Sequence, residues 1–184
     1  MSLSFLSHSA ANSPTCSKRP GENVKYTPLF GVWLIDIILY FGWHRPSHPR
    51  RWPDIFEDSD FCAMTALDTD HEEQPERVTA GHCMKLLVRQ RQKLAKKKLS
   101  DSLPFFRNIK LLTGMLNLAE ADQAVFTFAA GLSIFTEFRS AIAPRTQKTT
   151  TDSLCKLLAH LTGIKEGEFH RALQPESPLV STGL

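Results

Sequence analysis

An apolar run, PLFGVWLIDIILYFGW over residues 28–43, constrains the fold more than any other segment. A helix that crosses a bilayer needs about 20 consecutive apolar residues, and this run is shorter and contains Asp36. Large apolar side chains recur at i, i+4, i+7 and i+8, which is one face of a helix: Trp33, Ile37, Tyr40 and Phe41. The run therefore predicts a buried amphipathic helix with Asp36 on another face, and no contact with a membrane.

The N-terminus and the cysteines bear on where the protein resides. Residues 1–25 are rich in Ser and Pro and have little apolar periodicity, which predicts a disordered arm. No basic run precedes the apolar residues of this arm, so it does not match a signal peptide. The four cysteines are scattered without CxxC spacing, at Cys16, Cys62, Cys83 and Cys155. Reduced thiols in a cytoplasmic protein are the expectation.

Helical periodicity continues through the middle of the chain and predicts a mostly α protein, with a helical bundle over residues 26–143. Pro104 restarts the chain, and the helix after it has core-facing positions at Ile109, Leu112 and Leu116. Asn117 and Glu120 have the spacing of a capping box, so a further helix should start there. That helix carries a predominantly apolar surface and should be central to the bundle: Val125, Phe126, Phe128, Ala129, Leu132 and Phe135. Pro144 should end it.

Residues 144–184 predict a helix-turn-helix or winged-helix-like segment, which we expect to be incomplete. Thr151 or Asp152 can cap a first helix with inward leucines at positions 154, 157, 158 and 161. Gly163 suits the turn, because glycine readily adopts positive φ. A second helix over residues 165–173 directs Phe169, Ala172 and Leu173 inward. The following SPLVSTGL occupies the place of a first wing strand.

Charged residues are segregated along the sequence. They are all acidic over residues 54–76 and all basic over residues 77–98. The basic part, MKLLVRQRQKLAKKKL, predicts a helix with Leu87, Arg91, Leu94 and Lys98 at helical spacing. Its exposed lysines could contact nucleic-acid phosphates: Lys93, Lys96, Lys97 and Lys98. We favour the alternative of a solvated face screened by the acidic segment.

The second helix of the C-terminal hairpin would offer Lys165 and Arg171 to nucleic acid or to a protein partner. It also carries Glu166 and Glu168, and carboxylates are poorly suited to face phosphates. A hairpin used for packing or protein contact is therefore the favoured interpretation.

Two segments resemble the helical region that precedes the ATPase module in a group of bacterial AAA-type ATPases. The first is NIKLLTGMLNLAEADQAVFTFAA. The second, LCKLLAHLTGIKEGEFHRALQPESPLVSTGL, contains a run similar to AL-x-x-x-S-P-L-V-x-x-G-L, with matches at Ala172, Leu173, Ser177, Pro178, Leu179, Val180, Gly183 and Leu184. The resemblance implies a non-catalytic recruitment or regulatory domain whose partners are an ATPase module or its substrate. The relatives continue into a nucleotide-binding module, so we expect a truncated gene product, one half of a split gene or a fragment.

Catalytic and metal motifs are missing from the sequence. No GxxxxGK[ST] loop or GxSxG elbow occurs. His44 and His48 are four residues apart, but Pro46 and Pro49 are incompatible with a regular helix there. We assign no catalytic residue, no cofactor and no metal ligand. The alternative function is that of a free-standing DNA-binding protein using the basic helix and the C-terminal hairpin.

Overall fold

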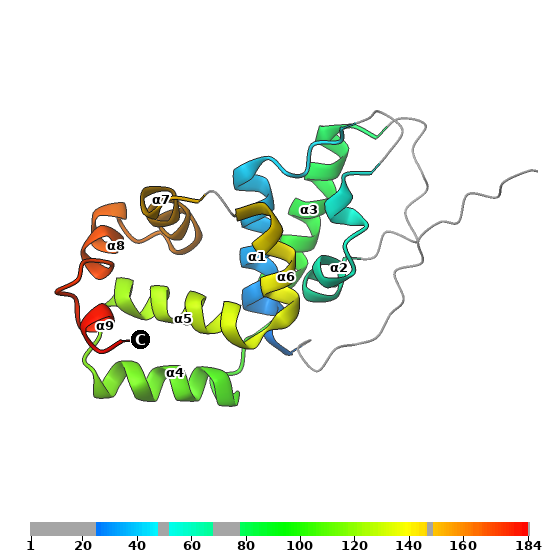
Figure 1. Ribbon diagram of the computed structural model, residues 1–184. Coiled ribbons are helices and arrows are strands. Elements are labelled where there is room, and N and C mark those ends of the chain that lie inside the picture. Colours follow the sequence, from blue (N-terminus) through cyan, green and yellow to red (C-terminus); the bar gives the residue numbers. More distant parts are fainter. Residues whose placement is uncertain (1–24, 48–51, 68–77, 147–148, 184) are drawn as a thin grey trace, which may run out of the picture.

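The computed structural model describes residues 25–47, 52–67, 78–146 and 149–183, and their regular structure is entirely helical (Figure 1). This confirms the mostly α prediction. The predicted disordered arm lies outside the described residues except for Lys25. The elements in chain order are α1 Thr27–Phe41, a 3₁₀ turn at Asp54–Phe56, α2 Ser59–Thr65, α3 Ala80–Ala95, α4 Pro104–Met115, α5 Glu120–Ile134, α6 Thr136–Thr146, α7 Thr151–Thr162, α8 Glu166–Ala172 and α9 Pro178–Ser181.

Helix α1 lies at the centre of one half of the molecule and packs against α2, α3, α6 and α7. It is enclosed on nearly all sides, since Phe30, Leu34, Ile35, Ile37 and Ile38 are fully buried. The prediction of a buried helix was correct, but the prediction of which side chains face the core was wrong in part. Tyr40, expected to face the core, is 42% exposed, whereas Asp36 is only 8% exposed.

Asp36 is buried because α3 supplies its partner. The guanidinium of Arg91 donates from Nε to Oδ1 at 2.6 Å and from Nη2 to Oδ2 at 2.9 Å. This bidentate pairing raises the pKa of Arg91. The predicted helix forms, and Leu87 and Leu94 of α3 are fully buried, but the helix ends at Ala95, so Lys98 lies beyond it.

No single helix in the described ranges has both the length and the apolar character that a bilayer crossing requires, although α5 and the first part of α6 together satisfy that criterion across a bend of 98°. The chain turns at Phe135, and α6 then runs to Thr146. The break therefore precedes the predicted one at Pro144. Phe135 is buried, with its ring 4.7 Å from that of Tyr26 and 4.8 Å from that of Phe30.

Helix α4 starts at Pro104 as predicted but is less buried than expected. Leu112 is 39% exposed, and Ile109 and Leu116 are only partly buried. The predicted capping box is displaced by two residues. Asn117 has a φ of 50°, and α5 begins after Ala119, whose N–H donates to Oδ2 of Asp122 at 3.2 Å.

The C-terminal hairpin forms as predicted. Thr150 caps α7, one residue before the expected cap, and Gly163 ends it with a φ of 78°. Phe169 and Ala172 of α8 are buried. Residues 178–181 of the expected wing strand form the short helix α9 instead, because Pro178 opens a turn that the Oγ of Ser177 caps. Helix α5 packs against α7, α8 and α9 as well as α6, so the hairpin and the bundle share one core.

Candidate functional site

The lysines predicted to contact a partner are exposed, but they do not form one surface with the hairpin. Lys93 lies in the last turn of α3, and Lys96, Lys97 and Lys98 follow its end. Lys165 and Arg171 are exposed at the two ends of α8. Helix α3 packs against α1 and α2, whereas α8 packs against α5, α7 and α9, and the two helices lie in opposite parts of the molecule in Figure 1. The two basic groups are therefore separate.

The acidic segment is described only in part, since residues 68–77 lie outside the described ranges. Asp60 of α2 faces α6, where Ser140 and Glu137 lie. Burial raises the pKa of Asp60, with further contributions from the neighbouring Asp58 and from Glu137 and an opposing hydrogen bond with Ser140. Screening of the lysines by the acidic segment therefore stays a prediction.

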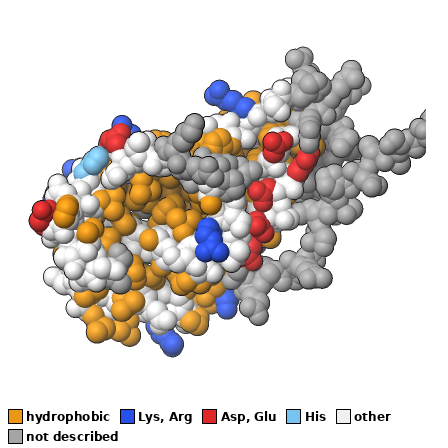
Figure 2. Space-filling view, viewed as in Figure 1, with side chains coloured by type: hydrophobic (Ala, Val, Ile, Leu, Met, Phe, Trp, Pro, Cys, Tyr) orange, Lys and Arg blue, Asp and Glu red, His pale blue; other side chains and the backbone are white. Residues whose placement is uncertain are grey.

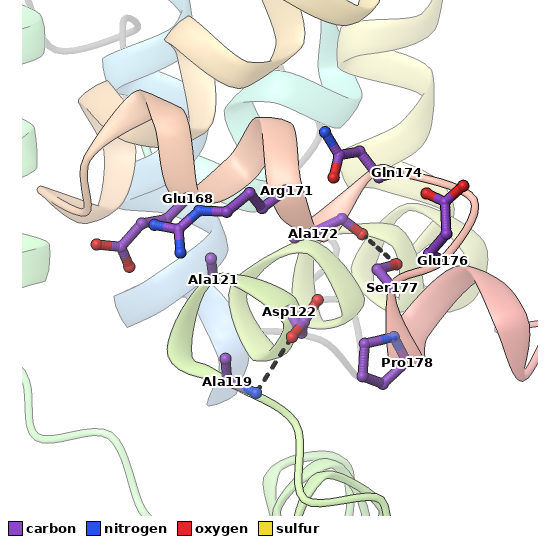
Figure 3. Close-up of a pocket in the computed structure, with 10 residues that line it drawn as sticks. All are labelled: Ala119, Ala121, Asp122, Glu168, Arg171, Ala172, Gln174, Glu176, Ser177 and Pro178. Carbon is purple, nitrogen blue, oxygen red and sulfur yellow. Dashed lines mark hydrogen bonds between the residues drawn. The ribbon is translucent and has the colours of Figure 1, made fainter.

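A pocket of about 410 Å³ opens between the start of α5 and the α8–α9 connection (Figure 3). It combines polar side chains from three elements with small apolar ones. Its lining is Ala119, Ala121, Asp122, Glu168, Arg171, Ala172, Gln174, Glu176, Ser177 and Pro178.

Some polar groups of this pocket form hydrogen bonds within the protein, and others do not. Asp122 is 5% exposed, and its Oδ1 atom is buried without a hydrogen-bond partner in the described structure. Ser177 donates to the carbonyl of Ala172 at 2.7 Å. Arg171 is the one cationic side chain of the lining, against the carboxylates of Asp122, Glu168 and Glu176. This composition suits a basic group better than an anion.

A second polar cluster lies where α7 meets α8. His170 Nε2 is 3.4 Å from Glu166 Oε1 and 3.6 Å from Asp152 Oδ1. The other oxygen of Asp152 accepts a hydrogen bond from Lys156 Nζ at 2.6 Å. This bond lowers the pKa of Asp152 and raises that of Lys156. One ligand atom from each of Asp152, Glu166 and His170 lies within 4.8 Å of the other two, as a metal site would require.

Sequence reasoning assigned no metal ligands and missed this cluster. The i, i+4 spacing of Glu166 and His170 was a visible signal, because such residues share one helical face. Asp152 joins them only through the turn at Gly163, whose angle is not encoded in any spacing. The proximity of His170 to Asp152 depends on that turn, whereas the lowered pKa of Asp152 comes mainly from the hydrogen bond with Lys156 on the same helix.

The other histidines and cysteines offer no nucleophilic pair among the described residues. Cys83 is fully buried, and burial raises the pKa of its thiol, which makes a poor nucleophile. The ring of its neighbour His82 packs against Trp52 instead. His44 is buried, and His48, the other member of that spacing, lies outside the described residues.

Helix α4 presents an apolar surface to solvent. Leu111 is 57% exposed, Leu112 39% and Met115 74%. Figure 2 shows hydrophobic side chains gathered on the part of the molecule that contains α4 and α5, with few charged groups among them. Exposed apolar side chains that adjoin one another are typical of interaction surfaces.

Comparisons of this chain with family models, curated proteins and solved structures find no match.

Proposed function

We propose that this chain acts as a non-catalytic recruitment or regulatory domain of an AAA-type ATPase. The observation that carries the proposal is the apolar surface of α4, formed by Leu111, Leu112 and Met115. Burial of such side chains in an interface is favourable by about 25 cal/mol for each Å² removed from water. A helix with this surface is suited to bind another protein.

The ATPase module is the partner that fits best. In the bacterial AAA-type ATPases that this chain resembles, the ATPase module follows the segment that corresponds to α9. Helix α9 and helix α4 both pack on α5. A module following α9 would therefore emerge close to the helix that also supports α4. The sequence has no phosphate-binding loop of its own, so the partner would supply nucleotide hydrolysis.

The experiment starts from the gene. We expect the DNA immediately downstream to encode a module with a GxxxxGK[ST] loop, in the same or a neighbouring frame. That module, expressed with the chain, should co-purify with it. Leu111→Ser combined with Met115→Ser should abolish co-purification, whereas Met84→Ser, at a residue 46% exposed on α3, should not.

Two results would contradict the proposal. One is a downstream region that encodes no phosphate-binding loop. The other is a complex with the module that survives the double α4 substitution, provided that circular dichroism shows the variant to be folded. ATP turnover by the purified chain alone would exclude a non-catalytic role.

DNA binding is the second candidate, and the exposure of the four lysines favours it. Among the described residues no carboxylate forms an ion pair with Lys93, Lys96, Lys97 or Lys98. Each phosphate contact should add a slope of roughly 0.9 to the salt dependence of duplex binding. Replacement of all four by Gln should flatten that slope, and Lys165→Gln with Arg171→Gln provides the matched control on α8.

We expect the parent chain to bind duplex DNA weakly and to lose binding near about 0.15 M salt, as non-specific binders do. A submicromolar dissociation constant at that salt concentration, lost in the quadruple variant and kept in the control, would make DNA binding the better interpretation.

A further inference from the structure

Two distances in the cluster at the α7–α8 junction, both from His170, match those of a coordination shell. A tetrahedral zinc ion with bonds of about 2.0–2.2 Å holds its ligand atoms roughly 3.3–3.6 Å apart. His170 Nε2 lies 3.4 Å from Glu166 Oε1 and 3.6 Å from Asp152 Oδ1. Since all three atoms lie within 4.8 Å of one another, a small rotation of a carboxylate suffices to enclose an ion.

The backbone holds these side chains in place. Glu166 and His170 occupy one face of α8, and α8 is anchored by Phe169, which is fully buried. Asp152 lies in the first turn of α7 but does not cap it, because the Oγ1 atom of Thr150 accepts the N–H of Ser153. The Asp152 carboxylate is therefore not engaged by the N–H groups at the start of α7.

Lys156 leaves one oxygen of Asp152 unused. Its ammonium group binds Oδ2, whereas Oδ1 is the oxygen that faces His170. With a neutral imidazole the cluster of two carboxylates and one ammonium group carries a net negative charge, which a divalent cation would compensate. One imidazole nitrogen with two carboxylate oxygens suits zinc, whereas magnesium and calcium prefer oxygen ligands alone.

We propose that Asp152, Glu166 and His170 bind a zinc ion that links α7 to α8, with water completing its coordination. The ion would fix the angle of the hairpin. Since Glu168 and Arg171 of α8 line the pocket beside α5, it would also fix their positions there. This proposal does not depend on the proposed function.

Zinc binding is measured on the full chain after treatment with a chelator. Calorimetric titration with zinc chloride should give one site per chain, and the thermal midpoint should rise by roughly 5–10 °C at a free zinc concentration about 100 times the dissociation constant. His170→Gln should weaken binding at least tenfold and remove the rise. His160→Gln is the matched control, because His160 is an exposed histidine of the same hairpin whose ring lies against Tyr40.

Two further measurements separate this site from others. Lys156→Gln should tighten zinc binding, because it releases the second oxygen of Asp152. Cobalt in place of zinc should give the visible bands of a nitrogen and oxygen site without thiolate charge-transfer absorption, since Cys155 is buried and burial raises the pKa of its thiol.

The proposal is overturned if the parent chain shows no saturable zinc binding with a dissociation constant below about 100 µM. It is also overturned if His170→Gln, with an unchanged circular dichroism spectrum, binds zinc as the parent does. The proposal would likewise be overturned if His160→Gln weakened zinc binding as much as His170→Gln does. A thiolate charge-transfer band with cobalt would also overturn it.

Discussion

Gly131→Ala tests the packing at the centre of the molecule. A Cβ atom at this position of α5 would lie 2.4 Å from Cε1 and 2.9 Å from Cζ of Phe30. Phe30 is fully buried, and its ring cannot move aside because it is surrounded at 4.8–5.6 Å by four other rings, those of Trp33, Phe105, Phe135 and Phe138.

The magnitude follows from two opposing effects. Overpacking of a core costs about 1–3 kcal/mol, and the depth of this overlap places the cost near the upper value. Alanine gains about 1 kcal/mol over glycine inside a helix. We therefore expect the free energy of unfolding to fall by about 2 kcal/mol, which lowers the thermal midpoint by roughly 4–8 °C in a chain of this size.

The assay is thermal and urea unfolding followed by circular dichroism. Gly114→Ala is the matched control, because Gly114 lies in α4 with no atom within 4 Å of the added Cβ, and alanine there should stabilise by up to about 1 kcal/mol. Phe30→Leu should partly rescue Gly131→Ala, with a coupling energy above about 1 kcal/mol. If Gly131→Ala stabilised the protein as Gly114→Ala does, the contact between α1 and α5 would be refuted.

Three other substitutions test the remaining structure. Phe169→Ala should cost about 3–5 kcal/mol, because its ring is fully buried, and an unchanged thermal midpoint would show that α8 is not packed. Arg91→Gln should cost about 1–3 kcal/mol in urea unfolding, since it leaves the buried carboxylate of Asp36 without its charged partner, and a loss below about 0.5 kcal/mol would argue against the pair. Lys156→Gln should raise the pKa of Asp152 towards its ordinary value, which nuclear magnetic resonance titration of the carboxyl carbon measures. Because the pKa of Asp152 is lowered in the folded state, this pair stabilises above about pH 4 and loses its effect as pH falls through the lowered pKa, so the variant should lack that part of the acid sensitivity.

Local patterns were enough to predict the α7–α8 hairpin. Its turn depends on Gly163 and its packing on leucines at helical spacing, and both are encoded within a few residues. The exposure of the lysines after α3 was predictable for the same reason. The position of the break between α5 and α6 at Phe135 was not predictable, because no proline or glycine marks it. The break depends on packing of Phe135 against Tyr26 and Phe30, about 100 residues away.

The orientation of α1 was also beyond local reasoning. A helix that is apolar on nearly every face has no periodicity to show which side contacts which partner. The burial of Asp36 depends on Arg91, 55 residues further along the chain. The pocket and the cluster at the α7–α8 junction are likewise formed by side chains from different helices, so their geometry follows from tertiary packing rather than from sequence spacing.

The enclosure of α1 has a consequence for biosynthesis. The helices that cover it include α3 and α6, and α6 is translated about 100 residues after α1, which takes roughly 5–20 s at ordinary ribosome speeds. During that interval the nascent chain carries an apolar helix whose Asp36 has no arginine to pair with until α3 emerges. Chaperone dependence during translation, and aggregation of chains that terminate before α6, follow from the order in which the partners of α1 are made.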